Sequence, residues 1–150
     1  MKIMNSSVKY KIRTLLGFTL FIIIVGSLSY LAVYKLSFLP NGYDIVSQQK
    51  DSVIVKKFNI IGLEKDIITL SFSENNLWKI EELNYGIKRQ KDFCWFLFTA
   101  SSISILILIL KLRKGEKFWN AVWGSRIFFA TLFPLLILMN SLNRIQDFIS

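Results

Sequence analysis

The side chains of this sequence that could do chemistry are its carboxylates, its hydroxyls and a single thiol, because the chain contains no histidine. Without an imidazole, the Ser-His-Asp triad, the usual Cys-His pair and most zinc and haem sites are excluded. The seven glycines are scattered and form no glycine-rich loop of the kind that binds phosphate groups. We therefore expect neither a metal nor a cofactor.

Carboxylates are the remaining candidates for catalysis, and eight of the ten lie between residues 41 and 92. Glu81 and Glu82 are adjacent, so in a strand they would point to opposite faces and could not flank one bond. Glu64 and Asp66 could meet in a turn, but they lack the spacing of a calcium-binding loop. The pattern indicates solvated carboxylates, and we expect that the protein is not an enzyme.

The single thiol belongs to Cys94, at the start of an apolar run. One cysteine cannot form a disulfide within the chain. A lone thiol in such a position usually behaves as a small hydrophobic residue. Palmitoylation and a bridge to a second chain are the alternatives.

Three long stretches carry no charge: 14–34, 93–110 and 127–143. A bilayer core about 30 Å thick requires roughly 20 apolar residues in a helix, so the first two are long enough and the third is marginal. Backbone N–H and C=O groups in lipid must form hydrogen bonds within their own segment, so each of the three runs is predicted to be a helix. The sequence therefore predicts a membrane α-helical fold with three transmembrane helices at 14–38, 93–110 and 127–143.

Two alternatives concern the first and third of these helices. Ser27 and Ser29 could serve a cleavable signal peptide, but the apolar run continues to Tyr34 and exceeds a signal core, which favours a retained signal anchor. The third run is short and contains Pro134, so a re-entrant or strongly tilted element is the alternative to a full crossing.

The net charge of +9 is unevenly distributed. Basic residues are concentrated in segments 1–13 and 111–126, whereas segment 41–92 holds eight basic and eight acidic residues. The positive-inside rule predicts that 1–13 and 111–126 are cytoplasmic and that 39–92 and the C-terminus are extracytoplasmic. The basic segments lack the interleaved aromatic residues of a known module, so we expect no nucleic-acid partner.

Segment 39–92 differs from the helices because its apolar residues recur with a period of two, which predicts a β-rich module of antiparallel strands. Residues 40–42 would form a turn after the first helix. One strand is predicted over 52–60, with Ile54, Phe58 and Ile60 on one face, and residues 43–49 would add another strand.

The clearest alternation covers residues 68–72 and is followed by the polar residues 74–76. A three-residue hairpin loop would place Trp78 opposite Phe72 and Ile80 opposite Leu70. So small a sheet needs a cover for its apolar face, from the helix ends, the membrane surface, a second copy of the chain or a partner. We expect a protein or peptide partner to bind this face, through Ile68, Leu70, Phe72, Trp78 and Ile80.

Two further segments are predicted to lie at the membrane surface. The basic loop 111–126 contains the apolar residues Phe118, Trp119, Val122 and Trp123, which would share one helical face in the headgroup region. The tail 144–150 continues the third helix as an amphipathic interfacial segment, with an apolar face of Leu142, Ile145, Phe148 and Ile149.

The function that these features favour is binding by a small multi-pass protein of a bacterial plasma membrane. Its β module would capture a peptide or protein, as in immunity against a membrane-active bacteriocin or in an accessory role within an envelope complex. The alternatives are a subunit of a larger membrane enzyme or transporter, a holin-like pore, and a homo-oligomer. The abundance of Ile, Lys and Asn is typical of an AT-rich bacterial genome, and no segment resembles a known family closely.

Overall fold

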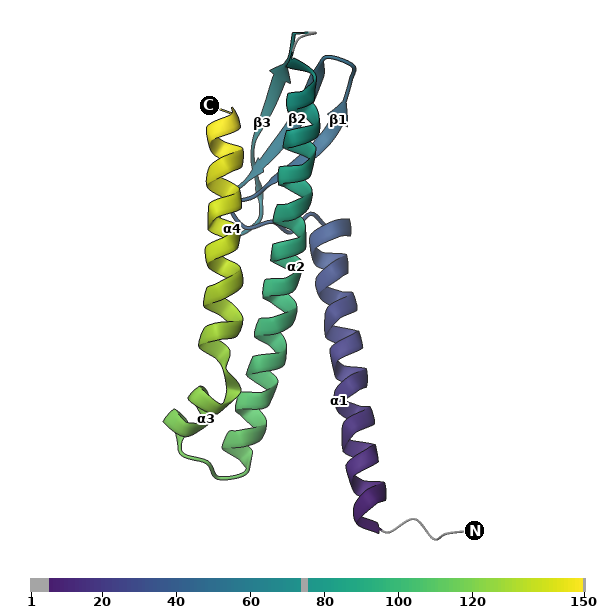
Figure 1. The fold of residues 1–150 in the computed structure, drawn as a ribbon, viewed down its shortest axis with the longest axis vertical. Coiled ribbons are helices and arrows are strands. Elements are labelled where there is room, and N and C mark those ends of the chain that lie inside the picture. The colour runs from purple at the N-terminus through teal and green to yellow at the C-terminus, as the bar shows by residue number, and fades with distance from the viewer. Residues whose placement is uncertain (1–5, 74–75, 150) are drawn as a thin grey trace, which may run out of the picture.

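The computed structural model describes residues 6–73 and 76–149 as three long helices, a short helix and a small sheet. Helix α1 (Ser6–Tyr30) continues into a π-helical turn, η1 (Leu31–Lys35), and strands β1 (Tyr43–Gln48), β2 (Ser52–Phe58) and β3 (Glu64–Ser71) follow. Helices α2 (Trp78–Arg113), α3 (Phe118–Ser125) and α4 (Ile127–Ile149) come next (Figure 1). Lys2 of the predicted basic N-terminus, and Glu74 and Asn75 of the predicted hairpin loop, lie outside the described residues.

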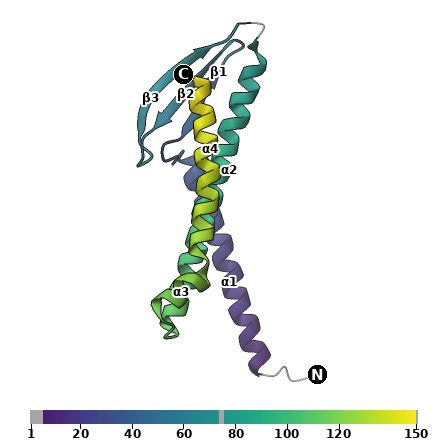
Figure 2. The ribbon, with the colours of Figure 1, turned by 60° about the vertical axis from the view of Figure 1, so that its left-hand side comes forward.

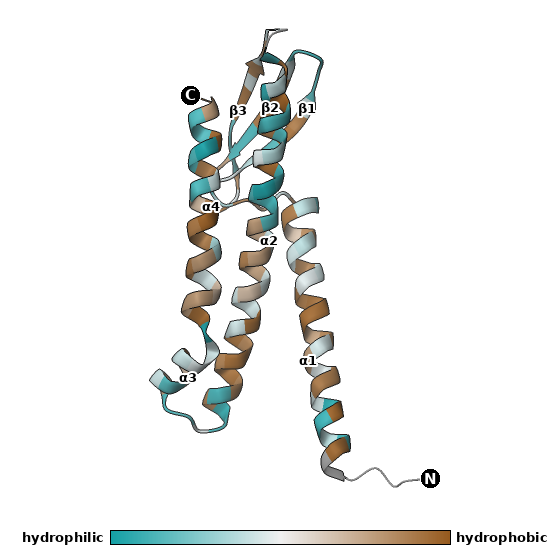
Figure 3. Ribbon diagram, in the orientation of Figure 1, coloured by the Kyte–Doolittle hydropathy of each residue, from teal (hydrophilic) through white to brown (hydrophobic). Residues whose placement is uncertain are grey.

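The prediction of three long apolar helices, with a small antiparallel sheet between the first two, is confirmed. Segments Val8–Lys35, Trp78–Arg113 and Ile127–Ile149 are each long and apolar enough to cross a membrane. Figure 3 shows that α2 and α4 are apolar away from the sheet and mostly hydrophilic beside it. We call residues 78–92 and 140–149 the sheet-side parts of these two helices, and the remainder their apolar parts.

The sheet has the order β1-β2-β3 with both pairs antiparallel. Its buried face differs from the prediction for residues 52–60, because Val53 and Val55 are fully buried while Ile60 is 75% exposed in the following loop. The run from Val53 to Val55 is β-branched on both faces, so alternation alone does not identify the inner one. A bulge at Phe58 then turns that side chain inward.

The predicted strand from Trp78 to Ile80 is wrong, because these residues form the first turn of α2. Leu70 pairs with Val53 instead of Ile80, and Ile68 pairs with Val55. A period of two over three residues cannot be distinguished from a helix, whereas Ile80, Leu83 and Ile87 recur at the helical spacing of three and four residues. The second long helix therefore begins at Trp78 rather than at residue 93.

The sheet-side parts of α2 and α4 cover the apolar face of the sheet (Figure 2). Val53 and Val55 of β2 pack in one cluster with Ile80 and Leu83 of α2 and Ile145 of α4. The tail 144–149 is amphipathic as expected, but its apolar face packs against the sheet and α2 instead of lying free for a membrane surface. The rings of Phe148 and Phe72 accordingly lie 6.3 Å apart.

Gln90 joins α2 to the edge of the sheet. Its side chain is fully buried; Oε1 accepts a hydrogen bond from the Tyr43 N–H at 3.0 Å, and Nε2 donates to the Tyr43 carbonyl at 3.1 Å. The amide thus pairs with β1 as a neighbouring strand would. A Cβ on Gly42 would lie 2.6 Å from this Nε2, so the close approach requires glycine there.

A second apolar cluster lies where the three long helices meet below the sheet. It contains Val33, Leu39, Phe58, Cys94 and Leu138, all buried. Above it, the Tyr34 hydroxyl donates a hydrogen bond to the Asp92 carboxylate. These contacts fix the direction in which the chain leaves η1 and enters β1.

Candidate functional site

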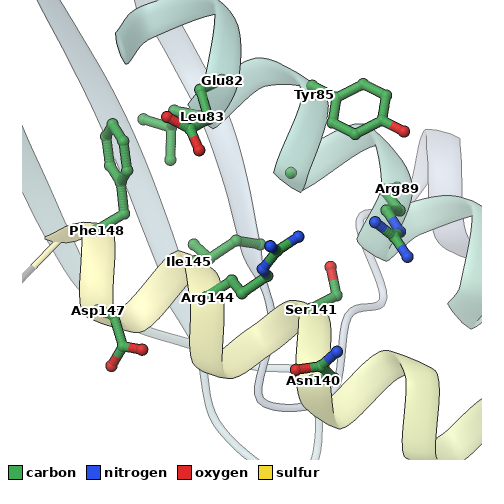
Figure 4. Close-up of a pocket in the computed structure, with 11 residues that line it drawn as sticks. Glu82, Leu83, Tyr85, Arg89, Asn140, Ser141, Arg144, Ile145, Asp147 and Phe148 are labelled. Atoms are coloured by element: carbon green, nitrogen blue, oxygen red, sulfur yellow. The ribbon is translucent and has the colours of Figure 1, made fainter.

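A groove lies between the sheet-side parts of α2 and α4, with a cavity volume of about 310 Å³ (Figure 4). The sheet packs on one side of these two helices, and the groove opens on the other. We call it the α2–α4 groove. It combines an apolar floor with a few polar groups, as ligand sites usually do.

The floor of the groove is formed by the same side chains that pack against the sheet. Leu83 and Ile145 are almost fully buried, and Gly86 brings the two helices together. A Cβ on Gly86 would lie 3.3 Å from Ile145 Cγ1, tighter than an ordinary van der Waals contact. A fixed helix pair therefore supports the groove, which gives it a defined shape before any ligand binds.

The walls carry charged side chains from both helices. Figure 4 shows Glu82, Arg89 and Arg144 directed toward the gap, with Tyr85 and Asp147 at its rim. Among the described residues, none of the four charged groups takes part in an ion pair. Arg89 makes a cation–π contact with Phe93, with its Cζ 5.7 Å from the centroid of the ring.

This arrangement suits binding of an acidic group. Two guanidinium groups and one carboxylate line the gap, and a guanidinium makes strong paired hydrogen bonds with carboxylate or phosphate. Asn140 and Ser141 add amide and hydroxyl groups beside them. In the described part of the chain, no cluster of three or more carboxylate or thiol side chains is arranged to hold a metal ion.

The five residues predicted to bind a partner do not form one exposed face. Ile80 lies in the buried core at 4% exposure, with Leu70 and Phe72 packed against the same cluster. Ile68 is half-buried on β3, and Trp78 is 59% exposed at the start of α2, where the Lys79 ammonium lies over its ring. The structure thus brings three of the five together, but as internal packing.

Sequence reasoning missed the groove. Its charged residues belong to two helices more than fifty positions apart in the chain, and nothing local marks them as neighbours. The only sequence signal is periodic: Glu82, Gly86 and Arg89 share one helical face, as do Ser141, Arg144 and Phe148.

Strand β3 provides a second open feature at the edge of the sheet. It pairs with β2 on one side, and among the described residues no strand pairs with its other side. Phe72 N–H donates to the Asp51 carbonyl, and donors alternate along an antiparallel pair, so the N–H groups of Ile67 and Thr69 point away from β2. An extended peptide could add there as a fourth strand.

Comparison of the chain with protein-family models, with curated proteins and with solved structures finds no match. The site must therefore be interpreted from its own geometry. The three apolar helices suggest association with a membrane.

Proposed function

We propose that the chain crosses a bacterial plasma membrane three times and displays the sheet on the extracytoplasmic side. The apolar parts of α1, α2 and α4 expose large side chains that suit lipid better than water, among them Leu16, Phe133 and Leu136, each at least 64% exposed. Basic residues support the orientation: the end of α1 far from the sheet carries Lys9, Lys11 and Arg13, and the α2–α3 loop at the same end carries more (Figure 1).

Helix α3 supports the same arrangement. It lies beside the basic loop, at the end of the molecule opposite the sheet (Figure 1), and exposes Phe118, Trp119 and Trp123 by 57%, 67% and 64%. Tryptophan is enriched at the boundary between lipid and water, where its apolar body and polar N–H are both accommodated. We therefore take α3 as a surface helix in the cytoplasmic headgroup region.

Cysteine labelling in intact cells tests the orientation. With the buried Cys94 replaced in a Cys94→Ala background, a Ser73→Cys variant is expected to react with an impermeant maleimide from outside, because Ser73 follows β3 and is exposed. A Glu116→Cys variant, in the α2–α3 loop, is the matched control and should react only after lysis. The reverse pattern would overturn the orientation.

Within this topology we propose that the protein binds a peptide or protein partner and catalyses no reaction itself. The observation that carries this proposal is the α2–α4 groove, a preformed concavity with unpaired charges beside the apolar parts of both helices. Roles such as immunity against a membrane-active peptide, or an accessory subunit of an envelope complex, would use a site of this kind.

The chemistry of the groove favours a partner segment with an acidic group. Such a group would meet Arg89 and Arg144 within the groove, while apolar parts of the partner would cover Tyr85 and Phe148. Pairing of both guanidinium groups would remove two unpaired charges at once. The β3 edge is a second contact for the same partner class.

Site-specific photocrosslinking tests this proposal in the membrane. A photoreactive amino acid at Tyr85, on the rim of the groove, should give one dominant adduct, whereas the same group at the exposed Lys88 outside the groove should not. An added Arg144→Glu change should reduce the Tyr85 adduct about tenfold, because a charge-assisted hydrogen bond contributes about 1.5–3 kcal/mol.

Three outcomes would count against the groove. Equal adducts from both positions, or a Tyr85 adduct that Arg144→Glu leaves unchanged, would show contact without recognition. A third probe placed at Thr69, on the open edge of β3, that gave the dominant adduct alone would instead move the partner to that edge.

A further inference from the structure

The loop between β2 and β3, residues 59–63, is unusually apolar for a turn at the end of a sheet. Ile60, Ile61 and Leu63 are 75%, 63% and 60% exposed. The β1–β2 turn at the other end of the sheet contains Gln49, Lys50 and Asp51, all polar. The two ends of the sheet therefore differ in the surroundings that suit them.

Most of the backbone N–H groups of this loop are paired within the loop. Asn59 Oδ1 accepts hydrogen bonds from the N–H groups of Ile61 and Leu63, at 3.0 and 2.9 Å. The Asn59 carbonyl accepts from Gly62 N–H at 3.0 Å, and Asn59 N–H donates to the Leu63 carbonyl at 2.9 Å. Unpaired backbone groups are the main obstacle to placing a loop in lipid, and here three successive donors are already paired.

The loop lies at the level where the apolar part of α2 begins. Gly62, at φ +75°, rests on Phe38, since a Cβ there would come within 2.8 Å of the ring. The Phe38 ring in turn lies 5.8 Å from that of Phe98. Phe98 is five residues into the uncharged run that starts at Phe93, or about 7.5 Å along the helix axis at 1.5 Å per residue.

Two lysines flank the apolar residues of the loop. Lys57 precedes it, with its ammonium 5.7 Å from the centroid of the Tyr43 ring, and Lys65 follows it. Both line a shallow depression together with Ile60 and Ile61. Lysines beside an apolar tip can reach lipid phosphates while the tip enters the acyl region.

We propose that residues 59–63 insert into the extracytoplasmic leaflet of the membrane and anchor the sheet to the lipid surface. The proposal rests on the membrane crossing proposed above. The lipid ligand is the boundary between phosphate headgroups and acyl chains, which contacts Ile60, Ile61 and Leu63. Anchored at this end, the sheet keeps its β1–β2 turn in the aqueous phase and holds the α2–α4 groove at a fixed height above the bilayer (Figure 2).

Depth-dependent fluorescence quenching tests the insertion. Single-cysteine variants Ile61→Cys, Leu136→Cys and Gln49→Cys, each in the full chain with Cys94→Ala, carry an environment-sensitive dye in phosphatidylcholine–phosphatidylglycerol vesicles. Leu136 is 65% exposed on the apolar part of α4 and reports on the crossing, and Gln49 reports on the opposite turn of the sheet. Spin labels attached to the lipids at a shallow position should quench the fluorescence of the dye at position 61 and leave that of the dye at position 49 nearly unaffected.

The result separates four outcomes. Quenching at Ile61 and at Leu136, with at least a fivefold weaker effect at Gln49, supports the anchor. Quenching at Leu136 alone overturns it while leaving the membrane crossing intact, and a blue-shifted but unquenched dye at Ile61 would assign the loop to a protein contact. No quenching at Leu136 would instead refute the crossing.

Discussion

The two parts of α2 follow opposite rules along one continuous helix. In its sheet-side part, Ile80, Leu83 and Ile87 are buried, and charged residues cover the outside. In its apolar part, Ile105 and Ile109 are 46% exposed, and the buried residues there include Ser104. The first part suits water outside, and the second would suit lipid in the proposed membrane crossing, where small polar residues mark helix contacts.

The sheet is therefore not a separate domain joined to the apolar helices, because α2 and α4 share its core. The helices that would span the membrane continue beyond it and supply the cover for the sheet. The groove and the sheet are therefore held by the same two helices, and a displacement of α4 against α2 would alter both. Changes in the sheet-side parts should affect folding of the module strongly, whereas equivalent changes in the apolar parts should not.

The largest effect is expected from Gln90→Leu. The change leaves the buried N–H and carbonyl of Tyr43 without partners, and each unsatisfied group costs about 1–3 kcal/mol. We expect the free energy of unfolding in mild detergent to fall by about 2–6 kcal/mol, measured by urea titration with Trp fluorescence. Lys88→Leu, at an exposed position on the same helix, is the control and should change it by less than about 0.5 kcal/mol.

A Gln90→Leu variant as stable as the control would mean that water or a rearranged side chain satisfies Tyr43. The link between α2 and β1 would then be packing alone.

A slightly smaller effect is expected from Ile145→Ala, which removes a buried side chain at the centre of the sheet-side cluster. Such truncations cost about 2–5 kcal/mol because the cavity closes only partly. Leu136→Ala, on the exposed face of the apolar part, is the matched comparison and should have little effect in the same detergent assay. Equal losses from both would break the distinction between the two parts of α4.

The sequence predicted the apolar parts well because absence of charge over a long run is a local property. It also identified the alternation of Ile68, Leu70 and Phe72, whose strand is confirmed as part of β3 and the residues that follow it. The strand prediction failed at Trp78, because a short apolar pattern is compatible with both a strand and a helix. The helix buries Ile80 against β2.

The candidate site could not be predicted from local sequence patterns, for a different reason. The groove lies where α2 and α4 approach closely at Gly86 and Ile145, and no spacing within either helix encodes that approach. Gln90 likewise resembles any polar helical residue until Tyr43 is placed beside it. Its burial could not be inferred from residue type, because glutamine is usually exposed.

The smallest effect concerns the boundary between the two parts of α2. There Lys91 pairs with Asp44 at 2.6 Å, with both side chains about 15% exposed, and Asp44 also accepts a hydrogen bond from Ser37 Oγ at 2.5 Å. The ion pair between Lys56 and Glu64, at 2.7 Å, is more exposed at 34% and 46%.

A double-mutant cycle of Asp44→Asn with Lys91→Met should give a coupling free energy of about 1 kcal/mol or more, since exclusion of water strengthens the pair. The equivalent cycle of Lys56→Met with Glu64→Gln should give about 0.5 kcal/mol or less, the range of solvent-exposed pairs, and should fade with added salt. If both cycles gave the same coupling and the same salt dependence, the ring of polar contacts around Asp44 would be as solvated as the open sheet. The boundary of the apolar part would then lie further along α2, beyond Phe93, because a solvated pair at Lys91 requires water at that height of the helix.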